Sequence, residues 1–197
     1  MDARLRAVRT PPRFRIRLLS RLAPVLPVLF PLAAGAAQGA PRVAVFDFEM
    51  FDTSGQNILA ERQAETKRLA LITADLRKRL SDAGYELVDL SPQKGAIEDR
   101  SPFRNCNSCE VPIARALGAD IEVIGLVQKV SNLILNINFQ LRDTESGAVL
   151  RAGSVDIRNN TDESWLRGVS YLVRNRLLDP PLTGKAALDA ATPAPKP

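Results

Sequence analysis

The sequence predicts a single α/β (α+β) domain, in which a mixed sheet packs with helices in the order β-α-β-α-β-β-β-α. Three observations predict this class. A short run that is apolar on both alternating faces, residues 42–48, is typical of a covered central strand. Helical spacing of apolar residues follows over about 61–83 and returns after residue 160. Between these helices, over 121–158, the period changes toward two, which indicates successive antiparallel strands.

The first half of the domain alternates strands and helices. Residues 49–60 contain Asp52, Ser54, Gly55 and Asn57 and predict a loop after the first strand. In the helix that follows, the apolar positions at helical spacing are Leu69, Ile72, Leu76 and Leu80. Gly84 is placed to end this helix in a left-handed conformation, and residues 85–90 predict a second short strand. The polar stretch 91–108 predicts a loop, which leads to a second helix over about 109–117.

The second half predicts neighbouring strands followed by one helix. Strands are expected over 121–130, 133–142 and 148–158, with a hairpin turn over 143–147. The sequence Asn160-Thr-Asp-Glu163 then offers a capping box, with Asn160 or Thr161 as the cap. The last helix presents Trp165, Val169, Leu172, Val173 and Leu177 on one face. Trp165, the only tryptophan, is therefore expected in the core.

Residues 1–40 have the order of a secretory signal peptide, which leaves residues 41–179 as the predicted folded domain. Arginines dominate the opening, an apolar run follows over 22–37, and small residues end it. Because this run is short and contains three prolines, we expect no stable membrane span after processing. Export then predicts a periplasmic protein. Residues 180–197 are rich in Ala and Pro without an apolar period and predict a disordered tail.

The net positive charge of the whole chain comes from the predicted signal peptide. The sequence has 27 Lys and Arg against 22 Asp and Glu, but residues 1–40 hold seven arginines and one acid. The remainder therefore has 20 basic and 21 acidic side chains (27 − 7 and 22 − 1), a formal charge near −1. Since phosphate neutralisation drives non-specific nucleic-acid binding, the processed protein is not expected to bind nucleic acid.

Cys106-Asn-Ser-Cys109 is the one motif that could carry chemistry. In an oxidising compartment, two cysteines at this spacing are most simply a structural disulfide. The alternative is a thiol-redox pair, because CxxC is the usual redox spacing and a helix start lowers a thiol pKa. The neighbouring Glu110 and the lack of a strand directly before the motif argue against that alternative. A metal site would need carboxylates beside the two thiols, because the sequence contains no histidine.

The absence of histidine also excludes Ser-His-Asp and Cys-His catalytic arrangements, and the sequence contains no glycine-rich phosphate loop. Asp47, Glu49 and Asp52 crowd the end of the first strand, where ligands gather in open α/β sheets. Paired carboxylates could bind a ligand or do acid–base work, but a solvated loop at the sheet edge is the favoured interpretation. We therefore predict no catalytic residue, no bound metal and no cofactor.

Longer stretches resemble a known family. The strand VAVFDFEM, the phrase KVSNLILNINFQLRD and the closing NNTDESWLRG resemble an uncharacterised family of exported bacterial proteins, the DUF3280 and DUF2380 domains of unknown function. The resemblance covers nearly all of residues 42–178. More distantly, the element order and the LGAD…VIG step are similar to the N-terminal domain of TolB and to CsgG-like envelope proteins. Those relatives imply a binding or assembly module, although this chain lacks a cysteine placed for lipidation.

The expected function is that of an exported periplasmic accessory or interaction protein, without catalytic chemistry of its own, which binds an unknown periplasmic protein. The family resemblance implies an envelope or quinoprotein oxidation system as its setting. Two alternatives come from other functional classes. One is a thiol-disulfide redox protein that uses Cys106 and Cys109, and the other is a small-ligand-binding module at the strand ends near Asp47.

Overall fold

A computed structural model describes residues 39–56 and 58–179 of the chain. The predicted tail over 180–197, and all but the last two residues of the predicted signal peptide, lie outside the described residues.

The described strands form one mixed sheet of six strands, which confirms the predicted fold class. Their order is β3-β1-β4-β5-β6, and β2 pairs with β4 beyond the end of β1. The bounds are Arg42–Val45 (β1), Glu49–Asp52 (β2), Glu86–Leu87 (β3), Ile121–Ser131 (β4), Ile134–Asp143 (β5) and Val149–Arg158 (β6). β1 is parallel to both of its neighbours, whereas β4, β5 and β6 form an antiparallel meander.

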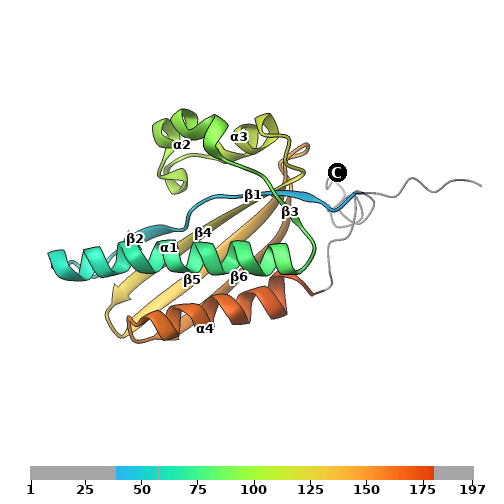
Figure 1. Cartoon of the computed structure of the whole chain (residues 1–197). Coiled ribbons are helices and arrows are strands. Elements are labelled where there is room, and N and C mark those ends of the chain that lie inside the picture. Colours follow the sequence, from blue (N-terminus) through green and yellow to red (C-terminus); the bar gives the residue numbers. More distant parts are fainter. Residues whose placement is uncertain (1–38, 57, 180–197) are drawn as a thin grey trace, which may run out of the picture. The chain divides into compact units, whose positions relative to one another are not determined.

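Helices lie on both faces of the sheet (Figure 1). On one face, α1 (Leu59–Asp82) and α4 (Asp162–Leu172) pack side by side and bury the main apolar core; a π-helical turn, Val173–Leu177, continues α4. On the other face, α2 (Lys94–Arg100) and α3 (Glu110–Ala116) cover a smaller core around Phe46 and Phe103. This second face is only partly covered, and the candidate functional site lies there.

The first strand is interrupted, so the prediction of one strand over 42–48 followed by a loop is wrong in detail. The Phe46 N–H still donates to the Val123 carbonyl oxygen at 3.0 Å, after which the chain leaves the ladder and re-joins β4 as β2, within the stretch predicted to be a loop. The Phe48 N–H donates to Thr73 Oγ1 of α1 at 3.1 Å, outside the sheet. The Phe48 ring then lies against Gly125, where an added Cβ would come within 2.2 Å of it. The step therefore depends on glycine at position 125.

Two other predicted elements differ from the structure. The second strand is shorter than 85–90, because only Glu86–Leu87 pairs with β1. The stretch 91–108 is not a loop throughout, since it contains α2 and two short 3-10 turns, Ser91–Gln93 and Phe103–Asn105. α2 is only seven residues long and packs a single apolar pair, Ala96 and Ile97, against the second core. So short an amphipathic segment has too few periods to stand out among charged residues.

The closing helix begins at one of the two predicted caps, but Glu163 pairs with Arg167 and does not complete the predicted capping box. Thr161 is its cap, and the Thr161 side chain accepts a hydrogen bond from the Ser164 N–H at 3.3 Å. Trp165 is fully buried, as predicted, and its Nε1 donates to Asn160 Oδ1 at 3.0 Å. The family phrase NNTDESW thus supplies both the cap of α4 and the partner of its buried indole.

A buried ionic network joins α1 to the end of β4. Lys129 is 1% exposed, and its Nζ lies 2.7 Å from Glu65 Oε1 and 3.7 Å from Asp52 Oδ2. Glu65 also accepts a hydrogen bond from Asn160 Nδ2 at 2.6 Å. Although burial lowers the pKa of Lys129, the hydrogen bond and charge of Glu65 outweigh it and leave that pKa raised. The ammonium group is therefore held charged inside the domain.

Candidate functional site

A cleft of about 410 Å³ opens on the partly covered face of the sheet, between strands β4 and β5 and the segment that precedes α3. Its walls include Glu49, Cys106, Glu110, Asn138, Gln140 and Arg142. Of the two cysteines only Cys106 lines the cleft, which brings together charged groups from four separate stretches of the chain. It lies within the size range of small-ligand sites.

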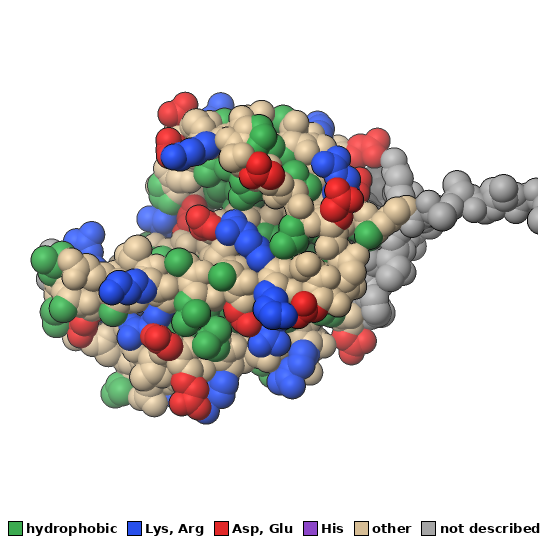
Figure 2. Space-filling model, viewed as in Figure 1, with side chains coloured by type: hydrophobic (Ala, Val, Ile, Leu, Met, Phe, Trp, Pro, Cys, Tyr) green, Lys and Arg blue, Asp and Glu red, His purple; other side chains and the backbone are tan. Residues whose placement is uncertain are grey.

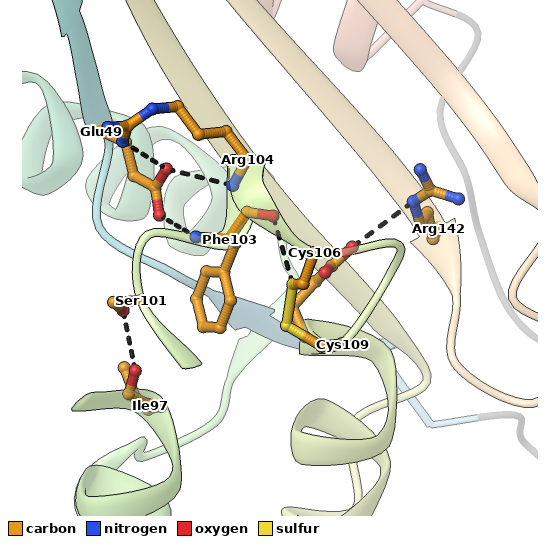
Figure 3. The surroundings of a disulfide bond; sticks show 9 residues. Glu49, Ile97, Ser101, Phe103, Arg104, Cys106, Cys109 and Arg142 are labelled. Carbon is orange, nitrogen blue, oxygen red and sulfur yellow. Dashed lines mark hydrogen bonds and ion pairs between the residues drawn. A yellow bond between two sulfur atoms is a disulfide. The ribbon is translucent and has the colours of Figure 1, made fainter. Parts of the chain in front are cut away.

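Glu49 fixes one wall of this cleft (Figure 3). Its carboxylate accepts hydrogen bonds from the Phe103 N–H at 2.5 Å and from the Arg104 N–H at 3.3 Å. The Arg104 guanidinium adds an ion pair at 3.4 Å. The Phe103 ring packs edge-on against Phe46, with the ring centroids 4.9 Å apart. A strand carboxylate thus anchors the segment that carries the cysteines.

A second cleft of about 630 Å³ lies on the other side of this anchored segment, bordered by Arg77 of α1 and by Lys94 and Glu98 of α2. Figure 2 shows the surface hollowed between α2 and α1, with acidic and basic side chains around the hollow. Phe103 and Arg104 line both clefts, so the anchored segment is the wall between them.

The structure places Cys106 and Cys109 in a disulfide directly before α3 (Figure 3). Cys106 Sγ lies 3.2 Å from the carbonyl oxygen of Phe103. Both sulfurs lie within 4.8 Å of a carboxylate oxygen of Glu110. Oxygen atoms with partial or full negative charge therefore surround the pair, and such surroundings disfavour a free thiolate.

Two carboxylates are buried behind the disulfide. Glu110 is 1% exposed and Glu122 is fully buried, and both lie beside the guanidinium of Arg142. Strand pairing sets Glu122 directly opposite Arg142. Arg142 Nε lies 3.6 Å from Glu110 and 3.5 Å from Glu122, which is too long for strong hydrogen bonds. Both oxygens of Glu122 and Glu110 Oε2 have no hydrogen-bond partner among the described residues.

This burial changes the titration of the cluster. Burial first, and the charge of Glu110 second, raise the pKa of Glu122 to about 8, although Arg142 opposes the shift. Glu122 therefore holds a proton at neutral pH. A protonated Glu122 leaves one charge fewer in the buried cluster, which is the direction expected where water is excluded.

The three carboxylates predicted at the first strand end are given separate partners. Asp47 pairs with Arg77 at 2.9 Å, Glu49 anchors the segment at Phe103, and Asp52 accepts two hydrogen bonds from Ser54. Burial raises the pKa of Asp52, but the Ser54 hydrogen bonds and the charge of Lys129 outweigh it and lower that pKa. Each carboxylate is thus engaged in a structural contact.

The polar asparagines of the sequence divide between the two faces. Asn136 and Asn138 lie on the partly covered face, where Asn136 Nδ2 donates to Asp156 at 2.7 Å. Asn132 instead donates to Glu61 of α1 at 2.8 Å, on the opposite side of the sheet. The open face therefore carries Asn136 and Asn138 but not Asn132.

Sequence reasoning missed the cluster of Glu110, Glu122 and Arg142. One local signal was present, because Glu122 lies between two apolar residues, Ile121 and Val123, at the start of a strand. A charge at a buried strand position needs a partner from another element. Which partner it has depends on the strand pairing, and only the structure supplies that.

No helix in the described part of the chain is long and apolar enough to cross a bilayer.

Comparisons with solved structures find similar folds at low sequence identity. The C-terminal domain of LpoB from Salmonella enterica is 19% identical, with a TM-score of 0.44 over 64% of this chain and 88% of that one. Lipoprotein GNA1162 from Neisseria meningitidis is 14% identical, with a TM-score of 0.44 over 68% of this chain and 96% of that one. TolB from Acinetobacter baumannii is 12% identical, with a TM-score of 0.36 over 71% of this chain and 30% of that one.

Sequence comparison identifies the family. No curated protein matches the sequence significantly. A family model does match, over residues 41–177, and its description is "Protein of unknown function (DUF2380)". That span includes every described helix and strand and the whole of the cleft. The chain belongs to the DUF3280 family, as its sequence resemblance predicted.

Proposed function

We propose that this protein is an exported accessory protein of the cell envelope, without catalytic chemistry of its own, that binds a partner protein. The observation that carries the proposal is the one-sided packing of the sheet. α1 and α4 cover one face, whereas α2 and α3 cover only part of the other. The remainder of that second face, over β4, β5 and β6, is called the open face below.

The open face has the composition of a protein-binding surface. The middle of this face on β5 and β6 is polar and uncharged or small, with Asn136, Asn138, Gln140, Ala152 and Ser154. Its charged side chains are Asp156 beside Asn136, Arg158 opposite Ile134, and Arg142 at the cleft end. At the hairpin end the face becomes apolar, because Phe51, Val130 and Ile134 are each more than two-fifths exposed. Exposed apolar side chains bordered by uncharged polar ones are typical of interfaces.

The direction of these side chains follows from strand alternation. Leu135 and Lys129 are buried toward α1 and α4, so the adjacent Ile134 and Val130 face the other way. Phe51 follows Glu49 by two positions and therefore shares its face, where the Arg104 guanidinium lies 5.9 Å from the Phe51 ring. The apolar and the polar parts of the open face are thus continuous.

Export rests on the sequence of residues 1–40, and the family resemblance supports an envelope or quinoprotein oxidation system as the setting. N-terminal sequencing of protein recovered from the periplasm tests the export step. We expect the mature chain to begin between Ala37 and Arg42. An intact Met1 on the soluble protein would contradict it.

Binding at the open face is tested with matched charge substitutions. Ile134→Asp places a carboxylate on this face, and Tyr171→Asp places one on α4, where Tyr171 is equally exposed at 43%. Periplasmic proteins captured by the wild type should be lost with Ile134→Asp and retained with Tyr171→Asp. Circular dichroism and thermal melting confirm that both variants fold. Equal capture by the three proteins would refute the assignment of this face.

A small-ligand-binding function is the second candidate, favoured by the cleft of about 410 Å³ beside the open face. This function would require Gln140 or Arg142, which line the cleft, and would be independent of Ile134. A thermal-shift screen of small anions, amines and sugars against the wild type and Gln140→Ala separates the two functions. A shift that is present in the wild type and lost in Gln140→Ala would support the ligand-binding alternative.

A further inference from the structure

Three potential metal ligands lie together beside the cleft, which two of them, Cys106 and Glu110, line. Cys106 Sγ, Cys109 Sγ and a carboxylate oxygen of Glu110 all lie within 4.8 Å of one another. The two sulfurs are bonded to one another in the disulfide, so the informative distances are those from the Glu110 oxygen to each sulfur. Ligand atoms of one metal ion are separated by distances of this order, since zinc–sulfur and zinc–oxygen bonds are about 2.0–2.3 Å long. The three residues come from one short segment, so α3 and the anchored wall position them together.

A second observation points to a cation independently of the cysteines. The Glu110 side chain is 1% exposed, and its Oε2 has no hydrogen-bond partner among the described residues. A buried carboxyl group needs a polar partner for each of its oxygens. Arg142 reaches only one of them, at 3.6 Å from Nε to Oε1. The remaining oxygen lacks a positive partner.

The oxygen atoms around Cys106 favour a metal ligand over a redox-active thiolate at this position. The Phe103 carbonyl oxygen and Glu110 both make a thiolate at Cys106 unfavourable on its own. A divalent cation reverses this effect, because it attracts the same oxygens and deprotonates coordinated thiols. Two thiolates and Glu110 would carry three negative charges, which one divalent ion and the guanidinium of Arg142 balance.

We propose that the reduced form of this protein binds one thiophilic divalent metal ion, such as zinc, through Cys106, Cys109 and Glu110. A dithiol reductant first passes two electrons and two protons to the disulfide, which gives two thiols and one oxidised reductant. The metal then displaces one proton from each thiol. Three protein ligands leave a fourth position for water or for a molecule in the cleft. The disulfide and the metal therefore exclude one another.

The sequence alone could not make this assignment, because two thiols without histidine need carboxylates of known position. The structure supplies Glu110 at that position. This site is away from the Ile134 end of the open face. Loss of partner binding in Ile134→Asp and loss of metal binding in Glu110→Gln can therefore be observed independently of one another.

The test compares the oxidised and reduced forms of the folded chain. Protein reduced with a phosphine and kept anaerobic is titrated with Co²⁺, followed by displacement with Zn²⁺. The reduced wild type should bind one equivalent, with the near-ultraviolet absorption of cobalt–thiolate bonds, and the oxidised form should bind none. Glu110→Gln should weaken binding about tenfold or more. Glu98→Gln, an exposed carboxylate change on α2, should have no effect.

A second measurement needs no variant. One equivalent of zinc should slow the alkylation of both thiols in the reduced wild type, and a chelator should restore the rate. The proposal is overturned if reduced protein binds cobalt no better than the Cys106→Ser/Cys109→Ser double variant, or if zinc gives no protection. Equal affinities of the Glu110→Gln and Glu98→Gln variants would remove Glu110 from the site.

Discussion

Replacing Glu122 by glutamine should remove a large part of the pH dependence of stability. Glutamine keeps the size of the side chain and cannot ionise. In the wild type, burial and the charge of Glu110 raise the pKa of Glu122 from 4.5 to about 8. The folded protein therefore retains a proton that the unfolded chain loses near pH 4.5. The contribution of Glu122 to the free energy of unfolding is therefore largest at low pH and is lost as the pH rises to about 8.

The magnitude follows from proton linkage. One unit of pKa difference corresponds to about 1.4 kcal/mol. Between about pH 6 and pH 8 the unfolded carboxyl is ionised, whereas the folded one is mostly protonated until the end of the range. The free energy of unfolding of the wild type should then fall by about 2 kcal/mol across that interval.

The assay is urea denaturation of the oxidised protein in the presence of a chelator, at several pH values over this range. The quantity compared is the difference in unfolding free energy between wild type and Glu122→Gln at each pH. As the pH rises from 6 to 8, the unfolding free energy of the wild type should fall relative to that of Glu122→Gln. Glu98→Gln, whose carboxylate is exposed, serves as the control and should follow the wild type. Parallel curves for Glu122→Gln and the wild type would show that Glu122 is ionised in the folded state.

Two further predictions concern packing. Glu65→Ala should lower the unfolding free energy by about 3–5 kcal/mol, because it leaves Lys129 buried without its nearest partner. The double change Glu65→Leu with Lys129→Met should recover much of this loss, because it removes the buried charge as well. Gly125→Ala should cost about 1–3 kcal/mol, because the added Cβ meets the ring of Phe48 at 2.2 Å. Gly95→Ala, with nothing within 4 Å of the added atom, should be neutral or stabilising by up to about 1 kcal/mol. Urea denaturation measures all of these changes, and equal costs at Gly125 and Gly95 would refute the steric argument.

Most of the fold could be predicted because its long elements carry many repeats of one period. β4 and β5 alternate buried and less buried positions over ten residues or more, and α1 repeats its apolar positions from Leu69 to Leu80, over about three turns. The features that escaped prediction depend on contacts between distant residues. Phe48 leaves the first strand because of Thr73 and Gly125, and no pattern within residues 42–52 records either contact.

In the candidate site too, residues close together in the sequence could be identified, whereas contacts between distant residues could not. Cys106 and Cys109 were identified from their spacing, and Glu110 was noticed only as their neighbour. Glu122 and Arg142 are 20 positions apart and meet because the β4–β5 pairing sets them opposite one another. Ionisable side chains inside a sheet can be noticed in a sequence, but the groups that neutralise them are fixed by strand register.

The hydrogen bonds of Glu49 to Phe103 and Arg104 have a consequence for how the two clefts can be used. The same short segment bounds a hollow of about 410 Å³ on one side and one of about 630 Å³ on the other. A molecule that displaced this partition would enlarge its own hollow at the expense of the other. By reciprocity, whatever occupies the second hollow then changes the affinity of the first by an equal factor. A single carboxylate on β2 thus holds the wall that two separate hollows of the domain share.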